Sequence, residues 1–299
     1  MIRFICLQVC SSEVRILSTE DVGAWVTSQI KGFLDSSENN LGEGWPERAW
    51  GEPLVGFSCG ADPLYDFYKR DIGDFYLLPI EFFSQTFPGV KAEPTDLAIV
   101  SWVLPQTEAT KNDHRKESTW PAERWARSRI FGEEVNNRLR SYLVQRLAGE
   151  GIQAVAPMLS PLWSSQRSEK YSFASAWSER HAAYAAGLGT FGLSDGLITP
   201  AGKAHRCGSV IAKVRIAPTP RTYTDHHAYC LFYAKGTCGV CVSRCPVGAI
   251  TEKGHDKERC RAHLESSRTV VERTYGFKGY GCGLCQTNVP CESRIPEGI

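Results

Sequence analysis

The chain has 299 residues, of which 42% are hydrophobic, and its 34 basic residues nearly balance its 33 acidic ones. This composition suits one large globular domain and a small one, without the overall basic surface that nucleic-acid binding favours. No apolar run is long enough to cross a bilayer. The first ten residues lack the features of a secretion signal, so we expect a cytoplasmic protein with free cysteines rather than disulfides.

Apolar segments in the first two thirds of the chain predict strands at 54–59, 98–104, 152–159 and 210–216. A long helix is predicted from Pro121 to Ala148, with Ser118 or Thr119 as its cap. Its apolar residues recur at helical spacing and are Trp125, Ile130, Phe131, Val135, Leu139, Leu143 and Leu147. Helices and strands together predict a mixed α/β (α+β) fold.

A glycine-rich segment from Trp177 to Ile211 predicts a helix, a tight turn and two strands. Gly187, Gly189 and Gly192 form a G-x-G-x-x-G pattern, but it follows a helix and precedes a strand, the reverse of a dinucleotide site. The turn either admits a flat or anionic ligand to its backbone or is an ordinary tight turn.

A proline-rich stretch, residues 217–220, follows the glycine-rich segment. It predicts a boundary between a first domain, 1–220, and a second domain, 221–299.

Two cysteine motifs occupy the last third of the chain. The first motif consists of Cys230, Cys238, Cys241 and Cys245, followed by Pro246, and the second consists of Cys260, Cys282, Cys285 and Cys291. The run from Cys238 to Pro246 keeps the last three cysteines of the C-x2-C-x2-C-x3-C-P pattern of bacterial two-cluster ferredoxins, in which the fourth cysteine binds the other cluster. The motifs therefore predict a ferredoxin-type domain with two 4Fe-4S clusters.

Crossed ligation divides the eight cysteines into two sets. The first set is Cys230, Cys238, Cys241 and Cys291, and the second is Cys245, Cys260, Cys282 and Cys285. A single zinc site made of the two C-x2-C pairs, at 238–241 and 282–285, is the alternative, but it leaves four cysteines without a role. Outside both sets, we expect Cys6, Cys10 and Cys59 to be small buried hydrophobic residues.

The order of these motifs resembles the cobalamin-dependent iron-sulfur reductases, namely epoxyqueuosine reductase and the reductive dehalogenases. The resemblance runs from about Trp177 to the C-terminus and rests on AGLGTFGLSDGLITP, then C-x2-C-x3-C-P-V-G-A-I, then YGCGLCQ. It implies a nitroreductase-like cobalamin-binding domain followed by a small ferredoxin-like domain. It also implies a corrin that lies over the glycine-rich backbone, with contacts from Gly187, Leu188, Gly189, Thr190, Phe191, Gly192, Thr199, Pro200, Cys207, Gly208 and Ser209.

The chain departs from both branches of that family. Epoxyqueuosine reductase carries a proton-donating Asp where this chain has residues 173–177 without a carboxylate, and it commonly has a helical extension after its clusters. We therefore expect that tRNA is not a substrate. The dehalogenases usually carry a catalytic Tyr, which aligns near residues 151–152, where no Tyr stands.

Three other side chains are candidates for the chemistry. The resemblance implies that Arg206 stabilises a leaving anion or holds a substrate acid, while a solvated surface arginine is an equally good interpretation. Tyr171 and Glu179 are candidate proton donors, although Glu179 also suits a purely electrostatic role near a helix start.

The favoured function is a cytoplasmic cobalamin-dependent reductase of a small molecule, or of a corrinoid carried by another protein. Its electrons would come from a low-potential donor such as a ferredoxin or flavodoxin. The alternative is a ferredoxin-type carrier or corrinoid-reducing activase that has no organic substrate of its own, and a zinc-stabilised binding module is a third interpretation. Cobalamin supplies reactivity in the first case, while clusters supply electrons in the first two.

Overall fold

The structure is a computed structural model that describes residues 19–299, so the interpretation of Cys6 and Cys10 lies outside the described residues. The helices are α1 Thr19–Asp35, α2 Pro63–Ile72, α3 Pro79–Thr86, α4 Glu108–Arg115, α5 Glu123–Gly149, α6 Glu179–Ala185, α7 Leu231–Lys235, α8 Val240–Ser243 and α9 Lys257–Tyr275. The strands are β1 Leu54–Cys59, β2 Ala98–Pro105, β3 Ala154–Val155, β4 Ser165–Ser168, β5 Ser172–Ser175, β6 Thr190–Phe191, β7 Leu197–Ile198, β8 His205–Ala212, β9 Ile250–Thr251 and β10 Gly254–His255. Short 3-10 turns are η1 Pro94–Asp96, η2 Pro157–Leu159 and η3 Leu284–Gln286.

The central sheet has the strand order β1-β2-β8-β3, and each neighbouring pair is antiparallel. In the β2–β8 register, Ile99 lies opposite Ile211 and Val100 opposite Val210. The first seven residues of β2 are buried, because both faces of this strand are covered. A continuous apolar run is typical of such a strand.

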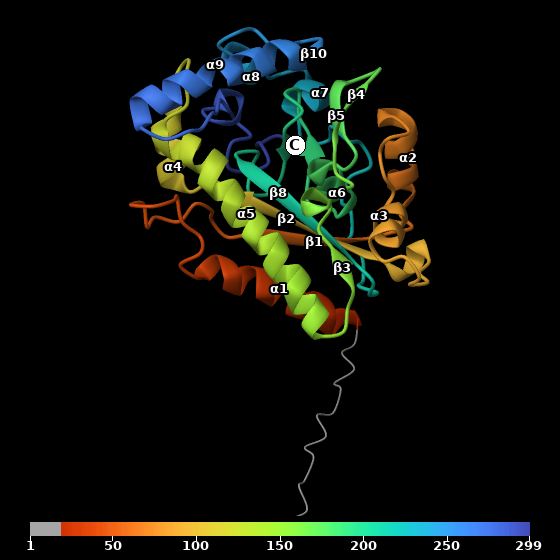
Figure 1. Ribbon diagram of the computed structural model, residues 1–299. Coiled ribbons are helices and arrows are strands. Elements are labelled where there is room, and N and C mark those ends of the chain that lie inside the picture. The colour runs from red at the N-terminus through yellow and green to blue at the C-terminus, as the bar shows by residue number, and fades with distance from the viewer. Residues whose placement is uncertain (1–18) are drawn as a thin grey trace, which may run out of the picture.

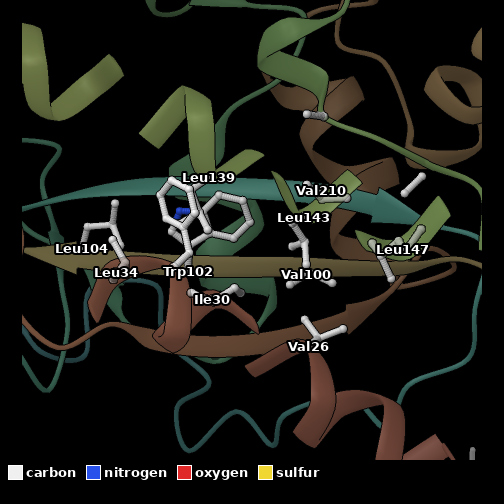
Figure 2. Packing of buried hydrophobic residues seen from close by; sticks show 14 of the residues in the cluster. Val26, Ile30, Leu34, Val100, Trp102, Leu104, Leu139, Leu143, Leu147 and Val210 are labelled. Carbon is white, nitrogen blue, oxygen red and sulfur yellow. The ribbon is translucent and has the colours of Figure 1, made fainter. Parts of the chain in front are cut away.

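One face of the sheet packs against α1 and α5 (Figure 1). Side chains at helical spacing on both helices meet the apolar residues of β2 and β8 there, as Figure 2 shows. The labelled residues of this cluster are Val26, Ile30, Leu34, Val100, Trp102, Leu104, Leu139, Leu143, Leu147 and Val210. Burial of this apolar surface stabilises the domain.

The opposite face carries α6, which contacts β1, β2 and β8. An aromatic cluster completes this layer, with Trp177 stacked at 5.8 Å from Tyr65 and 6.0 Å from Tyr76, between ring centroids. The Trp177 indole nitrogen donates to Ser209 Oγ on β8 at 3.0 Å. The sheet is thus buried on both faces, as in a mixed layered fold.

The C-terminal helices α7, α8 and α9 gather at the end of the molecule away from α1 (Figure 1). Helix α9 begins after Asp256, whose carboxylate accepts from Arg259 N at 3.0 Å, and it contacts β5 and α5. His263 on α9 bonds to the carbonyl oxygen of Thr119 at 2.9 Å. Within the described residues, no helix is long and apolar enough to cross a membrane.

The expected α/β class is confirmed, and the strand at 54–59 is found as predicted. Three local predictions were wrong. The last predicted strand lies earlier, at His205–Ala212, because its polar start pairs with β2. Only Ala154–Val155 of 152–159 is a strand, since Pro157 begins a 3-10 turn. Helix α5 has Ala122 as its N-cap, without a side-chain hydrogen bond, instead of the expected Ser118 or Thr119.

The proline-rich stretch packs along the edge of the sheet. Thr219 N donates to the Phe57 carbonyl and Phe57 N donates to Thr219 Oγ1, both at 2.9 Å. These bonds hold the segment between β8 and the cysteine motifs against β1. Both residues belong to the first predicted domain, and the boundary at 220 remains a prediction.

Candidate functional site

Cysteines from both motifs line one cavity. Its four sulfur-bearing residues are Cys230, Cys238, Cys241 and Cys291. The first precedes α7 as its N-cap, and this short helix ends at Gly236, whose φ of 65° is left-handed. The chain then turns back through Cys238 into α8, which carries Cys241.

Cys291 reaches this cavity from the far end of the second motif. Its carbonyl oxygen accepts from Lys203 N at 2.8 Å. Gly202 makes the approach possible, because a Cβ at that position would stand 2.1 Å from the Glu292 carbonyl oxygen. The segment between β7 and β8 therefore holds the last cysteine beside the first three.

The other four cysteines are neighbours of one another. Burial raises the pKa of the Cys260 thiol to about 11, and the nearby Cys285 and Cys245 sulfurs contribute to the shift. Burial likewise raises the pKa of Cys282 to about 11, with contributions from Cys260 and Cys245. Turn η3, which carries Cys285, packs against α8. Cys285 lies near Cys241 of the first set as well as near Cys282 and Cys245, so the two predicted sets adjoin at Cys285.

The donor set around the first cavity fits a 4Fe-4S cluster. Each iron of such a cluster takes one thiolate, and four cysteines surround the cavity. Leu193, Ile198, Phe232 and Val289 form apolar parts of its wall. Within residues 19–299, no three His, Cys, Asp or Glu side chains are arranged to hold a single metal ion.

A buried lysine forms part of the same wall. Lys203 is 3% exposed, and its Nζ donates to Ser194 Oγ at 3.1 Å. Burial opposes its charge, but the sulfurs of Cys291 and neighbouring cysteines outweigh this effect and raise the pKa of Lys203. Sequence reasoning missed this residue, because a lone Lys between two strands carries no pattern.

A second missed residue lies beside the other cysteine set. His114 is fully buried and stacks on Trp125 at 4.1 Å between ring centroids. Trp125 in turn covers Gly283, where a Cβ would stand 2.2 Å from the indole. Burial lowers the pKa of His114 to about 3, so the imidazole is neutral at ordinary pH. The start of α5 thus packs directly on the loop between Cys282 and Cys285.

Most of the residues expected around a corrin are internal. Seven of the eleven are buried, namely Leu188, Gly189, Thr190, Gly192, Thr199, Gly208 and Ser209. Phe191 and Cys207 are partly exposed. The absence of a side chain at Gly189 and Gly208 is required by the protein itself, because a Cβ would stand 2.2 Å from the Ile198 carbonyl oxygen and 2.3 Å from Trp102, respectively.

Three of the eleven do line an open hollow of about 290 Å³. They are Gly187, Leu188 and Pro200, and the opposite wall comes from α1 and the start of β1. Gly192 instead lines the cysteine cavity. The predicted corrin contacts thus lie on separate surfaces, and these residues do not form a single cofactor face.

Arg206 and Glu179 belong to one chain of ion pairs. Arg206 Nη2 lies 2.7 Å from Glu133 Oε2, whose carboxylate also meets Arg140 at 3.0 Å. Arg140 then lies 3.2 Å from Glu179. Burial alone would raise the pKa of Glu133, but Arg206 and Arg140 lower it to about 2. The pKa of Glu179 is raised, because burial outweighs the attraction of Arg140.

Arg129 lies beside this network on α5. The charge of Arg206, followed by burial, lowers the pKa of Arg129 to about 10. Its guanidinium donates to Tyr280 Oη at 2.5 Å and lies over that ring. Arg206 is therefore a paired, one-third exposed residue in a group of charges, and a lone solvated arginine is excluded.

Tyr171 lies apart from that network. It stands in the turn between β4 and β5, where its hydroxyl donates to Asp71 Oδ2 at 2.5 Å. The Lys257 ammonium lies 5.3 Å from the centre of its ring. Burial, together with Asp71, raises the pKa of Tyr171. The structure thus connects two of the three candidate catalytic residues through side-chain contacts and leaves Tyr171 outside them.

The fold of this chain is shared with one of the solved structures reported below. No family model matches the chain. A solved epoxyqueuosine reductase, bound to an epoxyqueuosine-modified tRNA stem loop, superposes with a TM-score of 0.52 at 18% identity, over 92% of this chain and 66% of that one. A catabolic reductive dehalogenase gives 0.49 at 13%, over 91% of this chain and 36% of that one. The chain thus shares the fold of the first and spans slightly less than two thirds of its length.

One curated relative matches a short part of the sequence. It is a Geobacillus stearothermophilus protein described as an uncharacterized protein in the gldA 3' region. The identity is 35% over 60 residues, which is 18% of this chain and 28% of the relative.

Proposed function

We propose that this protein is an iron-sulfur oxidoreductase that holds two 4Fe-4S clusters by crossed ligation. The observation that carries the proposal is the cavity lined by three cysteines of the first motif and by Cys291 of the second. An ordinary packing role does not require four thiols around one cavity. The first cluster would be held by Cys230, Cys238, Cys241 and Cys291, and the second by Cys245, Cys260, Cys282 and Cys285.

When bound, such clusters supply one-electron transfer at low potential. The protein's own residues would ligate them, exclude water with an apolar wall and place the first cluster against the β6–β7 hairpin. Gly192, Leu193 and Ile198 of that hairpin contribute to the cavity wall. Electrons would therefore reach the glycine-rich segment, while a low-potential ferredoxin or flavodoxin is the donor we propose.

The group that accepts the electrons distinguishes two candidate functions, a reductase and an electron carrier. The shared fold with epoxyqueuosine reductase favours a cobalamin-dependent reductase. The burial of seven expected corrin contacts favours the alternative, a ferredoxin-type carrier or corrinoid-reducing activase. Because the expected residues do not form one corrin face, we assign no step to cobalamin.

The substrate of a reductase would be a small molecule, a protein-bound corrinoid or a nucleic acid. The expectation that tRNA is not a substrate has no support, since the solved reductase of similar fold contains a tRNA stem loop. A modified stem loop therefore belongs in the substrate screen. In any such reaction Arg206, held by Glu133, would present a positive charge to an anionic group.

The test is anaerobic purification from a cobalamin-supplied host, followed by iron, sulfide and cobalt analysis of one sample. We expect about eight irons per chain in the wild type and about four in Cys238→Ala or Cys285→Ala. Cys59→Ala is the matched control, because Cys59 lies on β1 outside both sets and should leave the iron unchanged.

Two results would decide between the alternatives. Stoichiometric cobalt supports the cobalamin-dependent reductase, whereas full iron without cobalt supports the carrier. Little iron together with bound zinc would refute both cluster assignments.

A further inference from the structure

The ammonium group of Lys203 is enclosed in protein beside the proposed first cluster. The residue is 3% exposed and lines the same cavity as Cys230, Cys238, Cys241 and Cys291. Its backbone N–H donates to the Cys291 carbonyl oxygen at 2.8 Å, and its Nζ donates to Ser194 Oγ at 3.1 Å. Backbone and side chain are thus both fixed.

No carboxylate pairs with Lys203 within the described part of the chain, where its Nζ donates to neutral Ser194 Oγ and its side chain also hydrogen-bonds to Cys291. A buried ammonium without a counter-charge is costly. The other charged groups at this cavity would be the cysteine thiolates of the cluster. A 4Fe-4S centre with four thiolate ligands carries net negative charge, and so it would be the missing counter-ion.

We propose that Lys203 raises the reduction potential of the first cluster above that of the second and so draws electrons towards the β6–β7 hairpin. This inference rests on the proposed function. A fixed positive charge stabilises the reduced cluster more than the oxidised one, because reduction adds a negative charge, and the low dielectric of a buried site strengthens the interaction. The second cluster is affected less, because Lys203 interacts with three sulfurs of the first set, Cys291, Cys241 and Cys230, and with one of the second, Cys285.

The first test is a potentiometric titration of the anaerobic protein, followed by electron paramagnetic resonance. In Lys203→Met we expect the equilibrium constant for reduction of the first cluster to fall at least tenfold. This corresponds to a potential lower by 59 mV for a one-electron couple. Lys203→Arg keeps the charge and should restore the wild-type value. Lys235→Met, which removes an exposed charge near the same motif, is the matched control and should change little.

A second test does not depend on substitution of Lys203. Cys260→Ala disrupts only the second set, so the cluster that it retains is the first one. The potential of the retained cluster should match the higher of the two wild-type potentials. If it matches the lower one, the inference fails, and this result does not require Lys203→Met to fold.

The outcomes separate the inference from the proposed function. Full iron in Lys203→Met with both potentials unchanged would overturn the role of Lys203 and leave the clusters standing. Absence of iron-sulfur clusters from the wild type would instead overturn the proposed function. A wild-type potential of the first cluster in Lys203→Arg would identify the charge of residue 203, rather than its packing, as the cause of the higher potential.

Discussion

The sheet layer and the cysteine segment differ in what holds them together. The sheet layer has a large apolar cluster formed by α1, α5 and the strands, whose residues are almost all inaccessible. The small cluster around the cysteine segment contains Leu193, Ile198, Ile250 and Val289, and its remaining buried members are Cys230 and Cys241. The first region has enough apolar burial to fold without a metal, whereas the second lacks it, as is typical of small metal-stabilised units.

Removal of iron should have the largest effect, because it should destabilise the cysteine segment and leave the sheet layer folded. In the chelated protein we expect residues 230–299 to lose protection against amide hydrogen exchange, while β1, β2 and β8 keep theirs. Exchange followed by mass spectrometry resolves the two regions. Equal protection of both regions in the iron-free protein would show that the cysteine segment folds on its own packing.

The substitution Trp102→Ala tests the opposite case, because it should destabilise the sheet layer and leave the iron content unchanged. Trp102 is fully buried, packs on Gly208 and donates to Asn136 Oδ1 at 2.8 Å. We expect a loss of about 3–5 kcal/mol in the free energy of unfolding, measured with urea, and no loss of iron from the folded fraction. Phe67→Ala is the control, because Phe67 is 48% exposed and should change stability little.

A smaller effect is expected from Glu133→Gln, which weakens the ion pairs to Arg206 and Arg140. We expect a loss of roughly 1–3 kcal/mol near neutral pH. Because the folded-state pKa of Glu133 is about 2, below its ordinary 4.5, its stabilisation is present above pH 4.5 and declines as the pH falls towards 2.

Urea unfolding of the iron-free chain between pH 7 and about 3 measures this dependence. The difference between wild type and Glu133→Gln should narrow below pH 4.5, the ordinary pKa. Glu134→Gln, an exposed neighbour on α5, is the matched control. If the difference in unfolding free energy between wild type and Glu133→Gln stays constant with pH, the ion pairs of Glu133 add nothing beyond packing.

The smallest effect concerns Asp256→Ala at the N-cap of α9. Loss of its bond to Arg259 N should cost about 1 kcal/mol and increase amide exchange in the first turn of the helix. The sheet layer should not respond. Glu252→Ala, an exposed change a few residues earlier, is the comparison, and an equal effect there would argue against a cap.

The sequence predicted those elements whose signal is local. The strand at 54–59 and most of α5 follow from apolar patterning. The polar β4–β5 hairpin has no such pattern, and its strands Ser165–Ser168 and Ser172–Ser175 are defined by pairing with each other. The start of β8 at His205 was missed for the same reason, since β2 supplies its partner.

The candidate site was predictable only in part. Cysteine spacing indicated the two sets, but nothing in the sequence placed Lys203 in the wall of the first cavity. The family resemblance implied a ligand over the glycine-rich segment, while Gly189 and Gly208 are required by close packing within the protein. A glycine in a sequence does not reveal whether the group packed against it is a cofactor or another part of the chain.

The position of Cys291 in the first cavity constrains how this protein matures. Its three companions there are made at least 50 residues earlier, since the nearest is Cys241. A cluster inserted while the ribosome is still translating the intervening segment would have one iron without its protein ligand. Assembly of the proposed first cluster would therefore wait until Cys291 has been translated, and until then the other three thiols would be open to oxidation.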